Sequence, residues 1–134
     1  IHPETKLSIL EVKWGLIPDM AGTPILRRIM KEDLIRELTY TGRIFTGVEA
    51  KEYGIATHLS EAPHHDAMKL AHEIASKSPT AVQTAKAIYN KLGDSTDAEA
   101  LLTESVEQDK IMGSPNQIEA VMAGLEKRAG NFKD

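Results

Sequence analysis

Two acidic residues, Glu11 and Asp19, have the side-chain type and the positions for proton-transfer chemistry. Glu11 follows a short alternating segment, residues 6–9, which is typical of a β-strand. Asp19 lies within residues 15–22, where glycine and proline predict a loop just before a helix. Active-site side chains are commonly carried on loops that leave a rigid element, so both positions suit catalysis.

The residues around Glu11 and Asp19 are largely apolar and could shield the two carboxyl groups from water. Burial disfavours a charged carboxylate and raises its affinity for a proton, which suits it to acid–base catalysis near neutral pH. The structural alternative is a solvated Glu11 at the end of a strand and an Asp19 that belongs to a turn, since isolated carboxylates are common in loops. The apolar neighbours are Leu10, Trp14, Ile17 and Met20.

The chain after residue 60 predicts four successive amphipathic helices, because apolar residues recur there at spacings of three and four. Ser114 and Gln117 predict a capping box, in which each side chain accepts a hydrogen bond from the other residue's backbone amide. The other boundary signals are Ser78-Pro79 and either Thr96 or Asp97 as helix starts, and Gly93 as a helix stop.

The front of the chain predicts shorter elements. They are helical segments that end at Gly42, a short helix that is capped by Thr46 and Glu49 and closes at Gly54, and a second brief strand over Ile55–Leu59. Two strands this short cannot form a stable sheet by themselves. We therefore expect the back part of a larger α/β protein, with most of its sheet upstream of Ile1; a small helical domain is the alternative.

Composition excludes several classes of protein. The chain has 134 residues, is 41% hydrophobic and 27% charged, and contains no cysteine, which excludes disulfides and thiol-based sites. Residues 1–60 carry eight cationic and eight acidic side chains, and residues 61–134 carry eight against twelve, which gives the net charge of −4. Nucleic acid is therefore not an expected partner. The sequence also predicts no membrane span, and we expect a cytoplasmic protein.

Histidine spacing gives no indication of a metal site, because His65 and His72 lack the i, i+4 separation of a helical ligand pair.

Four segments closely resemble, in order and spacing, the crotonase superfamily of enoyl-CoA hydratases and isomerases. They are Glu11–Thr23, Leu38–Arg43, Ala50–Ile55 and Glu126–Phe132. The resemblance covers almost the whole chain, but it corresponds to only the back half of a family member.

The resemblance implies an α/β fold in which a ββα spiral core is followed by a C-terminal helical trimerisation region. Residues 1–60 would be the end of the core with an active-site loop, and residues 61–134 the helical region. Members act on acyl-CoA thioesters and stabilise an enolate-like oxyanion with two backbone amides, which would lie upstream of this chain. The resemblance implies a homotrimer or a dimer of trimers, with no metal or redox cofactor and CoA as the carrier of the substrate.

By the same resemblance, Glu11 occupies the position of a hydratase catalytic glutamate whose partner glutamate lies upstream. Asp19 departs from the hydratase loop Pro-Gly-Ala-Gly-Gly-Thr, and an aspartate there resembles the dienoyl-CoA isomerases. Moving double bonds requires one group to take a proton and another to deliver one elsewhere, so we favour an isomerase. A hydratase and a non-catalytic fragment or oligomerisation module are the alternatives.

The C-terminal segment of the family also implies ligand contacts. Lys127 matches a lysine that contacts a phosphate of the CoA nucleotide, and Phe132 would line the acyl or adenine end of the ligand. The alternative for Lys127 is structural, because a cation at a helix C-terminus interacts favourably with the helix dipole, by about 0.3–1 kcal/mol.

Overall fold

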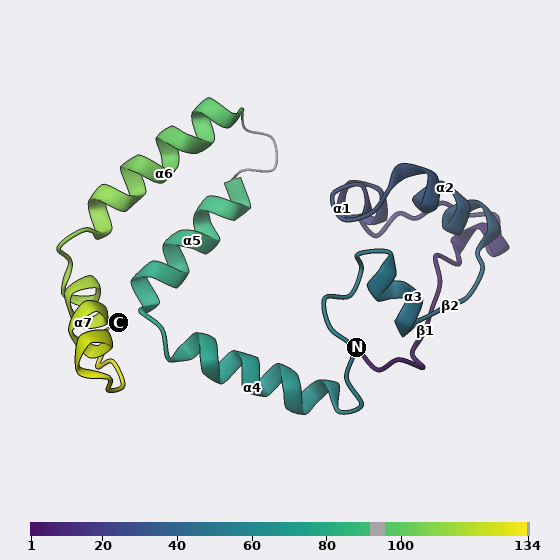
Figure 1. Ribbon diagram of the computed structural model, residues 1–134. Helices are drawn as coiled ribbons and strands as arrows, with labels where there is room; N and C mark the ends of the chain where they lie inside the picture. The colour runs from purple at the N-terminus through teal and green to yellow at the C-terminus, as the bar shows by residue number, and fades with distance from the viewer. Residues whose placement is uncertain (92–95, 134) are drawn as a thin grey trace. The chain divides into compact units, whose positions relative to one another are not determined.

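The computed structural model describes residues 1–91 and 96–133. It divides into two compact units, Ile1–Ala67 and Met68–Asp134. Both strands of the described chain belong to the first unit, and helices make up the regular structure of the second (Figure 1). The division by role, residues 1–60 and 61–134, stays a prediction.

A small antiparallel pair of strands opens the first unit. Strand β1 (Lys6–Leu7) pairs with β2 (Phe45–Thr46), with Lys6 opposite Thr46 and Leu7 opposite Phe45. The strand expected over residues 6–9 is therefore present but shorter. Its partner, β2, was not predicted, because two residues between a helix end and a helix cap are too few to show alternation.

The prediction of a second strand over Ile55–Leu59 is wrong. This segment is irregular, because its first backbone amides are used elsewhere. The amides of Ile55 and Ala56 both donate to the carbonyl oxygen of Ala50, at 2.9 and 3.1 Å. They close the end of the preceding helix instead of pairing with a strand.

The first unit also contains four short helical elements: the 3₁₀ helix η1 (Glu11–Trp14), α1 (Gly22–Leu26), α2 (Glu32–Thr41) and α3 (Gly47–Glu52). Helix α3 packs against both strands. The predicted capping box of α3 is confirmed. Thr46 Oγ1 accepts from the Glu49 amide at 3.3 Å, and a Glu49 carboxylate oxygen accepts from the Thr46 amide at 2.8 Å. Both orphan amides of this helix start are thereby satisfied.

The core of the first unit is small. Met30, Leu38, Phe45 and Ala50 are buried and pack together, with Leu38 fully enclosed. Gly47 allows the N-terminal segment to lie close against the start of α3, since a Cβ at Gly47 would lie 2.1 Å from the carbonyl oxygen of His2. This unit therefore buries few side chains, drawn from α2, β2, α3 and the turn after α1.

Helix α4 (Pro63–Ala75) begins in the first unit and continues into the second, which also contains α5 (Pro79–Lys91), α6 (Asp97–Ile111) and α7 (Pro115–Glu126). Helix α5 packs against both α6 and α7. Pro79 begins α5 as predicted. Of the two candidate caps for α6, Thr96 caps the helix, in a reciprocal arrangement with Glu99. Gly93, the predicted stop signal, lies outside the described residues.

Of the two hydrogen bonds predicted for the capping box of Ser114 and Gln117, one is present. Ser114 Oγ accepts from the Gln117 amide at 3.3 Å. However, the Gln117 side-chain oxygen accepts from the amide of Gly113, at 3.1 Å, rather than from Ser114. The returning bond is therefore displaced by one residue, and the helix start still has both bonds.

The apolar stripes that the sequence predicts on the helices are mostly not covered within the described chain. Tyr89, on the predicted stripe of α5, is 77% exposed. Large exposed apolar patches usually mark surfaces that contact another molecule or another part of the same one. The other exposed stripe residues are Leu70 and Ile74 on α4, Leu101, Leu102 and Val106 on α6, and Ile118, Val121, Met122 and Leu125 on α7. Among the described helices, none combines the length and the apolar character needed to cross a bilayer.

Candidate active site

Glu11 is the first residue of η1, which follows β1 after a short connection. The 3₁₀ turn is closed by backbone bonds from Gly15 to Val12 and from Leu16 to Glu11, each of 3.1 Å. Gly15 ends it with φ at +70°, a conformation that costs glycine little. The sequence expectation that Glu11 stands just past a strand is therefore confirmed, although the element that carries it is a 3₁₀ turn.

The C-terminus of α2 packs against η1. Gly42 ends α2 with φ at +57°, and a Cβ there would lie 3.1 Å from Val12 Cγ1. The Ser8 hydroxyl donates to the Gly42 carbonyl oxygen at 3.1 Å. Because Ser8 and Val12 flank Glu11, the end of α2 fixes the position of this carboxylate.

Glu11 has one carboxylate oxygen, Oε2, that is buried and has no hydrogen-bond partner among the described residues. Leaving a buried polar group unpaired costs about 1–3 kcal/mol, and more when it is charged. Native proteins keep such groups rarely, and a functional site is one of the few reasons for keeping them. An unpaired carboxylate oxygen is free to accept a proton from a ligand.

Asp19 lies in the turn before α1 and is exposed. The apolar residues expected to shield the two carboxylates are themselves exposed: Trp14 by 76%, Ile17 by 78% and Met20 by 84%. Partial burial is therefore found at Glu11 and not at Asp19. Among the described residues, no hydrogen bond links the two carboxyl groups.

The loop that carries Asp19 is strained. Ala21, the N-cap of α1, has φ at +60°, in the left-handed region that side chains other than glycine avoid. This conformation costs a non-glycine residue roughly 1–2 kcal/mol, and such strain is concentrated at functional sites. The hydratase loop Pro-Gly-Ala-Gly-Gly-Thr has glycine at the position of Ala21. This chain therefore has a left-handed backbone at a residue that is not glycine.

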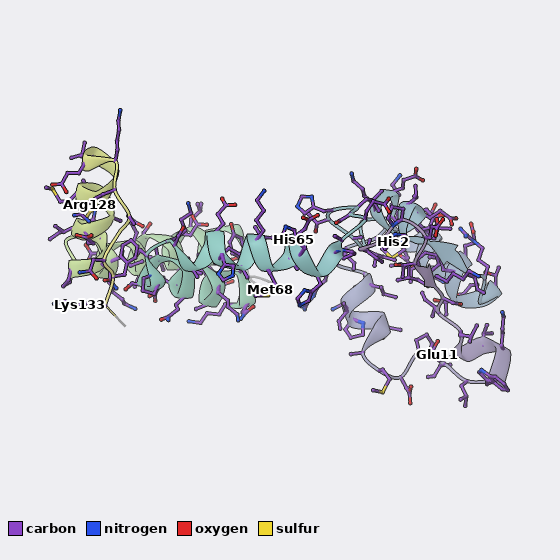
Figure 2. The ribbon with its side chains drawn as sticks, turned by 90° about the horizontal axis from the view of Figure 1, so that it is seen from below. His2, Glu11, His65, Met68, Arg128 and Lys133 are labelled. Carbon is purple, nitrogen blue, oxygen red and sulfur yellow. The ribbon has the colours of Figure 1, made fainter. Side chains whose placement is uncertain are left out.

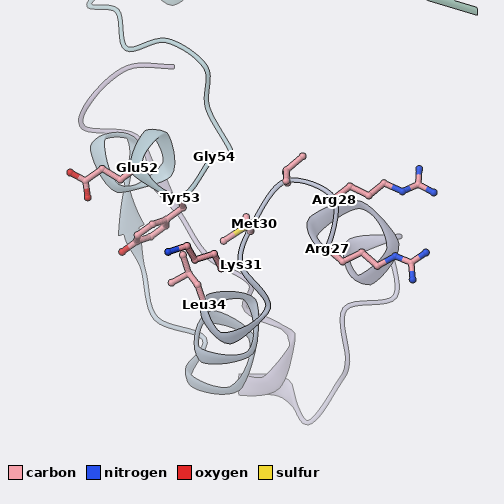
Figure 3. Close-up of a pocket in the computed structure, with 9 residues that line it drawn as sticks. Arg27, Arg28, Met30, Lys31, Leu34, Glu52, Tyr53 and Gly54 are labelled. Atoms are coloured by element: carbon pink, nitrogen blue, oxygen red, sulfur yellow. The ribbon is translucent and has the colours of Figure 1, made fainter. Parts of the chain in front are cut away.

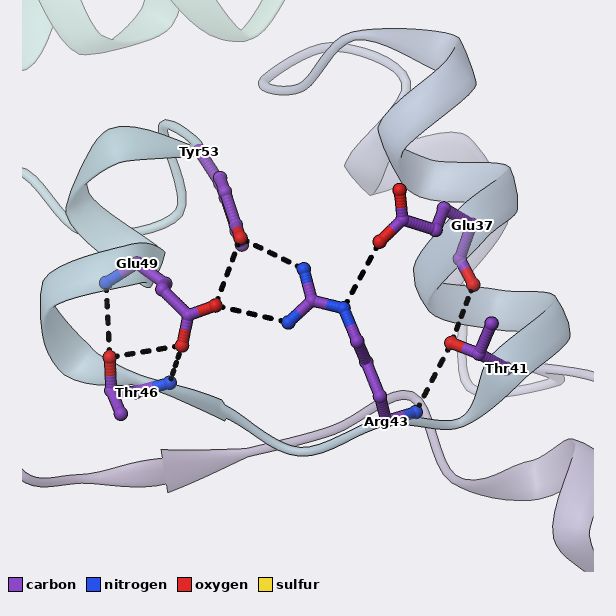
Figure 4. A network of polar contacts seen from close by, with 6 residues as sticks. All are labelled: Glu37, Thr41, Arg43, Thr46, Glu49 and Tyr53. Carbon is purple, nitrogen blue, oxygen red and sulfur yellow. Dashed lines mark hydrogen bonds and ion pairs between the residues drawn. The ribbon is translucent and has the colours of Figure 1, made fainter.

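A polar network around Arg43 joins α2, β2 and α3 (Figure 4). The Arg43 guanidinium donates to Glu37 at 3.1 Å, to Glu49 at 3.0 Å and to the Tyr53 hydroxyl at 2.9 Å. The Tyr53 hydroxyl in turn donates to Glu49 at 3.1 Å. The motif Leu38–Arg43 indicated no separate role for Arg43, because its partners Glu49 and Tyr53 lie outside that motif. In the structure, Arg43 holds α2 and α3 together.

The network shifts the pKa values of Glu49 and Arg43. The pKa of Glu49 is lowered to about 2, first by the hydrogen bond from the Thr46 amide and then by the bond from Arg43. The pKa of Arg43 is raised by its hydrogen bonds to Tyr53, Glu37 and Glu49. Both groups are therefore charged throughout the neutral range. They act as structural supports and not as acid–base groups.

A hollow of about 580 Å³ lies beside this network (Figure 3). Lys31, Leu34 and Tyr53 line one side of it, and the side chains of Arg27 and Arg28 extend away from Tyr53. Neither Glu11 nor Asp19 lines this hollow. It is therefore separate from the two predicted proton-transfer groups.

The predicted ligand-contacting residues of the C-terminal segment follow α7. Lys127 ends the helix with φ at +53° and is exposed. Phe132 is half-buried, and its ring folds back over Gly130, where a Cβ would lie 2.4 Å from Phe132 Cζ. Figure 2 shows Arg128 and Lys133 beside the same helix. This segment is held there by Asn116 and Glu119, which sequence reasoning missed although their spacing of three places them on one helix face.

Within residues 1–91 and 96–133, no three histidine, aspartate or glutamate side chains are grouped as metal ligands would be.

Comparison with known proteins identifies the family. The sequence profile of the enoyl-CoA hydratase/isomerase family matches residues 2–134. The chain belongs to this family. A solved enoyl-CoA hydratase from Bacillus anthracis shares the fold, with a TM-score of 0.92 and 28% identity over 98% of this chain and 52% of that one. The expected crotonase-type fold class is thereby confirmed, and the trimerisation role of its helical region stays a prediction.

Two curated relatives carry different activities in their names. Enoyl-CoA hydratase domain-containing protein 2, mitochondrial, from Mus musculus is 30% identical over 94% of this chain and 45% of its own length. Delta(3,5)-Delta(2,4)-dienoyl-CoA isomerase, mitochondrial, from Dictyostelium discoideum is 30% identical over 97% of this chain and 45% of its own length. The chain therefore spans a little under half of each relative. That it corresponds to the C-terminal half stays a prediction.

Proposed function

We propose that this chain supplies the proton-transfer groups of an enzyme that acts on an unsaturated acyl-CoA thioester and moves its double bonds. The observation that carries the proposal is the buried, unpaired carboxylate oxygen of Glu11. In a family that processes enoyl-CoA substrates, such an oxygen is suited to take a proton from the substrate. The resulting enolate would be stabilised by two backbone amides, which the resemblance places upstream of this chain.

Asp19 favours isomerisation over hydration. Glu11 would take a proton at one carbon, and Asp19 would deliver one at another, which shifts the double bonds without net addition. Asp19 is suited to this second role because a strained turn holds it at the exposed face of the loop. The Dictyostelium relative named as a dienoyl-CoA isomerase supports this choice.

Hydration is the second candidate function. It requires two groups gathered around a single water, and Glu11 would be one of them. The mouse relative and the solved Bacillus anthracis structure, both named for enoyl-CoA hydratase, favour this reaction.

The experiment makes Glu11→Gln and Asp19→Asn in the natural gene product. Both variants are compared on a dienoyl-CoA and on an enoyl-CoA, with turnover followed by ultraviolet absorbance. Positioned acid–base groups contribute about 10²–10⁴-fold to rate. We expect Glu11→Gln to lose about this factor on both substrates and Asp19→Asn to lose it in isomerisation only. Asp109→Asn, an exposed residue of α6, is the control. Undiminished isomerisation by Asp19→Asn would exclude Asp19 from proton transfer. Hydration without any isomerisation by the unaltered protein would leave the hydratase.

For the carrier, we propose that Lys127 binds a phosphate of the CoA nucleotide and that Phe132 lines the adenine or acyl end. The exposed Lys127 ammonium forms no ion pair with a carboxylate of the described chain, so its charge is available to a phosphate. No metal or redox cofactor is part of the proposal.

A cytoplasmic location also stays a proposal, since the mouse and Dictyostelium relatives are named as mitochondrial.

We propose further that the exposed apolar stripes of α5, α6 and α7 assemble a homotrimer or a dimer of trimers. Sedimentation velocity of the purified protein is expected to give a mass of three or six chains, and a monomer would contradict this assembly. The competing candidate is a non-catalytic module. Its test is the denatured mass of the natural gene product: 14.7 kDa would favour the module, and about twice that value would favour the enzyme.

A further inference from the structure

The segment after α7, residues 128–133, is folded back on the helix by charged hydrogen bonds to Glu119. Glu119 accepts from the two terminal guanidinium nitrogens of Arg128, at 2.5 and 3.1 Å. It also accepts from the backbone amide of Asn131, at 2.7 Å. The bond from Arg128 and then that from Asn131 lower the pKa of Glu119 to about 2. One carboxylate thus binds both the start and the middle of the segment.

Asn116 holds the far end of the same segment. Its side chain is buried, and its amide group pairs with both backbone groups of Lys133: the oxygen accepts from the amide at 2.8 Å, and the nitrogen donates to the carbonyl at 2.7 Å. The same nitrogen donates to Thr80 Oγ1 on α5, at 2.9 Å. The Asn116 side chain therefore satisfies both backbone hydrogen-bonding groups of Lys133, as a paired β-strand would. It also links α7 to α5 through Thr80.

Lys127 and Phe132 are both positioned by these contacts. Lys127 lies immediately before Arg128, which Glu119 binds, and Phe132 lies between Asn131 and Lys133, whose amides are both bonded to α7. The Phe132 ring also packs over Gly130. The backbone that carries both side chains is thus held in place before any ligand arrives, so the ordering of this segment does not have to accompany binding.

We propose that Asn116 and Glu119 are positioning residues that fix the C-terminal segment as a preformed contact for the nucleotide end of CoA. This inference rests on the CoA contacts assigned to Lys127 and Phe132 under the proposed function. Asn116 and Glu119 do not touch the ligand. They act through the segment that carries the two contacting side chains.

The test uses Asn116→Ala and Glu119→Gln with two substrates, an acyl-CoA and the matching acyl-pantetheine, which lacks the nucleotide. We expect KM for the acyl-CoA to rise about tenfold in each variant, the size of one lost hydrogen bond. We expect kcat and KM for the acyl-pantetheine to stay unchanged. A general loss of structure would affect both substrates. The control is Glu126→Gln, because Glu126 also pairs with Arg128, at 2.6 Å, without contacting an amide of the segment.

Hydrogen exchange at the amides of Asn131 and Lys133 reports on the segment itself. Faster exchange together with a raised KM for the acyl-CoA supports the positioning role. Faster exchange with an unchanged KM overturns it, as does unchanged exchange in both variants. Lys127→Ala tests the ligand contact separately: a raised KM there, with an unchanged KM in Asn116→Ala and Glu119→Gln, rejects the positioning role and leaves the proposed function standing.

Discussion

The Ser8 hydroxyl donates a hydrogen bond to the Gly42 carbonyl oxygen, with 3.1 Å between the two oxygens. The two residues are 34 positions apart in the sequence and join the connection after β1 to the end of α2. Glu11 follows Ser8 by three residues, in the 3₁₀ turn that rests on Gly42. The position of the candidate catalytic carboxylate therefore depends on a helix end that contributes no catalytic group.

Replacing Gly42 is expected to disturb Glu11 specifically. In Gly42→Ala, the new Cβ meets Val12 Cγ1 at 3.1 Å and the backbone stays at a positive φ. Gly113→Ala has the same backbone penalty, of about 1–2 kcal/mol, but its Cβ meets no atom within 4 Å. Urea unfolding should show both losses, whereas only Gly42→Ala should reduce kcat. Equal kcat values in the two variants would contradict the support of η1 by α2.

Ala21→Gly is expected to stabilise the protein. Alanine is destabilised by the left-handed backbone conformation at position 21, and glycine is not. The free energy of unfolding of Ala21→Gly should therefore rise by roughly 1 kcal/mol. The same substitution at Ala120, inside α7, should lower it by about 1 kcal/mol, because glycine weakens a helix interior. Chemical denaturation measures both. A loss of stability in Ala21→Gly would show that the loop before α1 is not strained.

The Arg43 network predicts a loss of stability in acid. The folded pKa of Glu49 is about 2, below its ordinary value of 4.5. The unfolded chain therefore binds more protons between these values, and the contribution of Glu49 is complete above pH 4.5 and is lost as the pH falls towards 2. We expect Glu49→Gln to lower the urea midpoint of the first unit at pH 7 and to flatten its decline in acid.

Glu52→Gln, an exposed neighbour on α3, is the control for this measurement and should keep the acid dependence of the unaltered protein. An acid dependence that is the same in Glu49→Gln as in the unaltered protein would reject the role of the network.

Much of the candidate site was visible in the sequence because its signals are local. The position of Glu11 after a strand and that of Asp19 before a helix follow from alternation and from glycine and proline breaks. The burial of Glu11 and the exposure of Asp19 were not predictable in the same way, because the same apolar neighbours flank both residues. The turn that carries Glu11 packs against the end of α2, which lies far away in the sequence.

The sequence alone determined the helix starts at Thr46 and Pro79, since a cap and the amides it satisfies lie within four residues of one another. It narrowed the start of α6 to Thr96 or Asp97, and the structure selects Thr96. The sequence also determined the family, through the order of its motifs. The tertiary structure decided that β1 pairs with Phe45–Thr46, that a Glu11 oxygen is left unpaired, and that Asn116 and Glu119 hold the C-terminal segment. These features bring together groups that are nine to about forty residues apart, and the periodicity of side chains carries no information about such pairings.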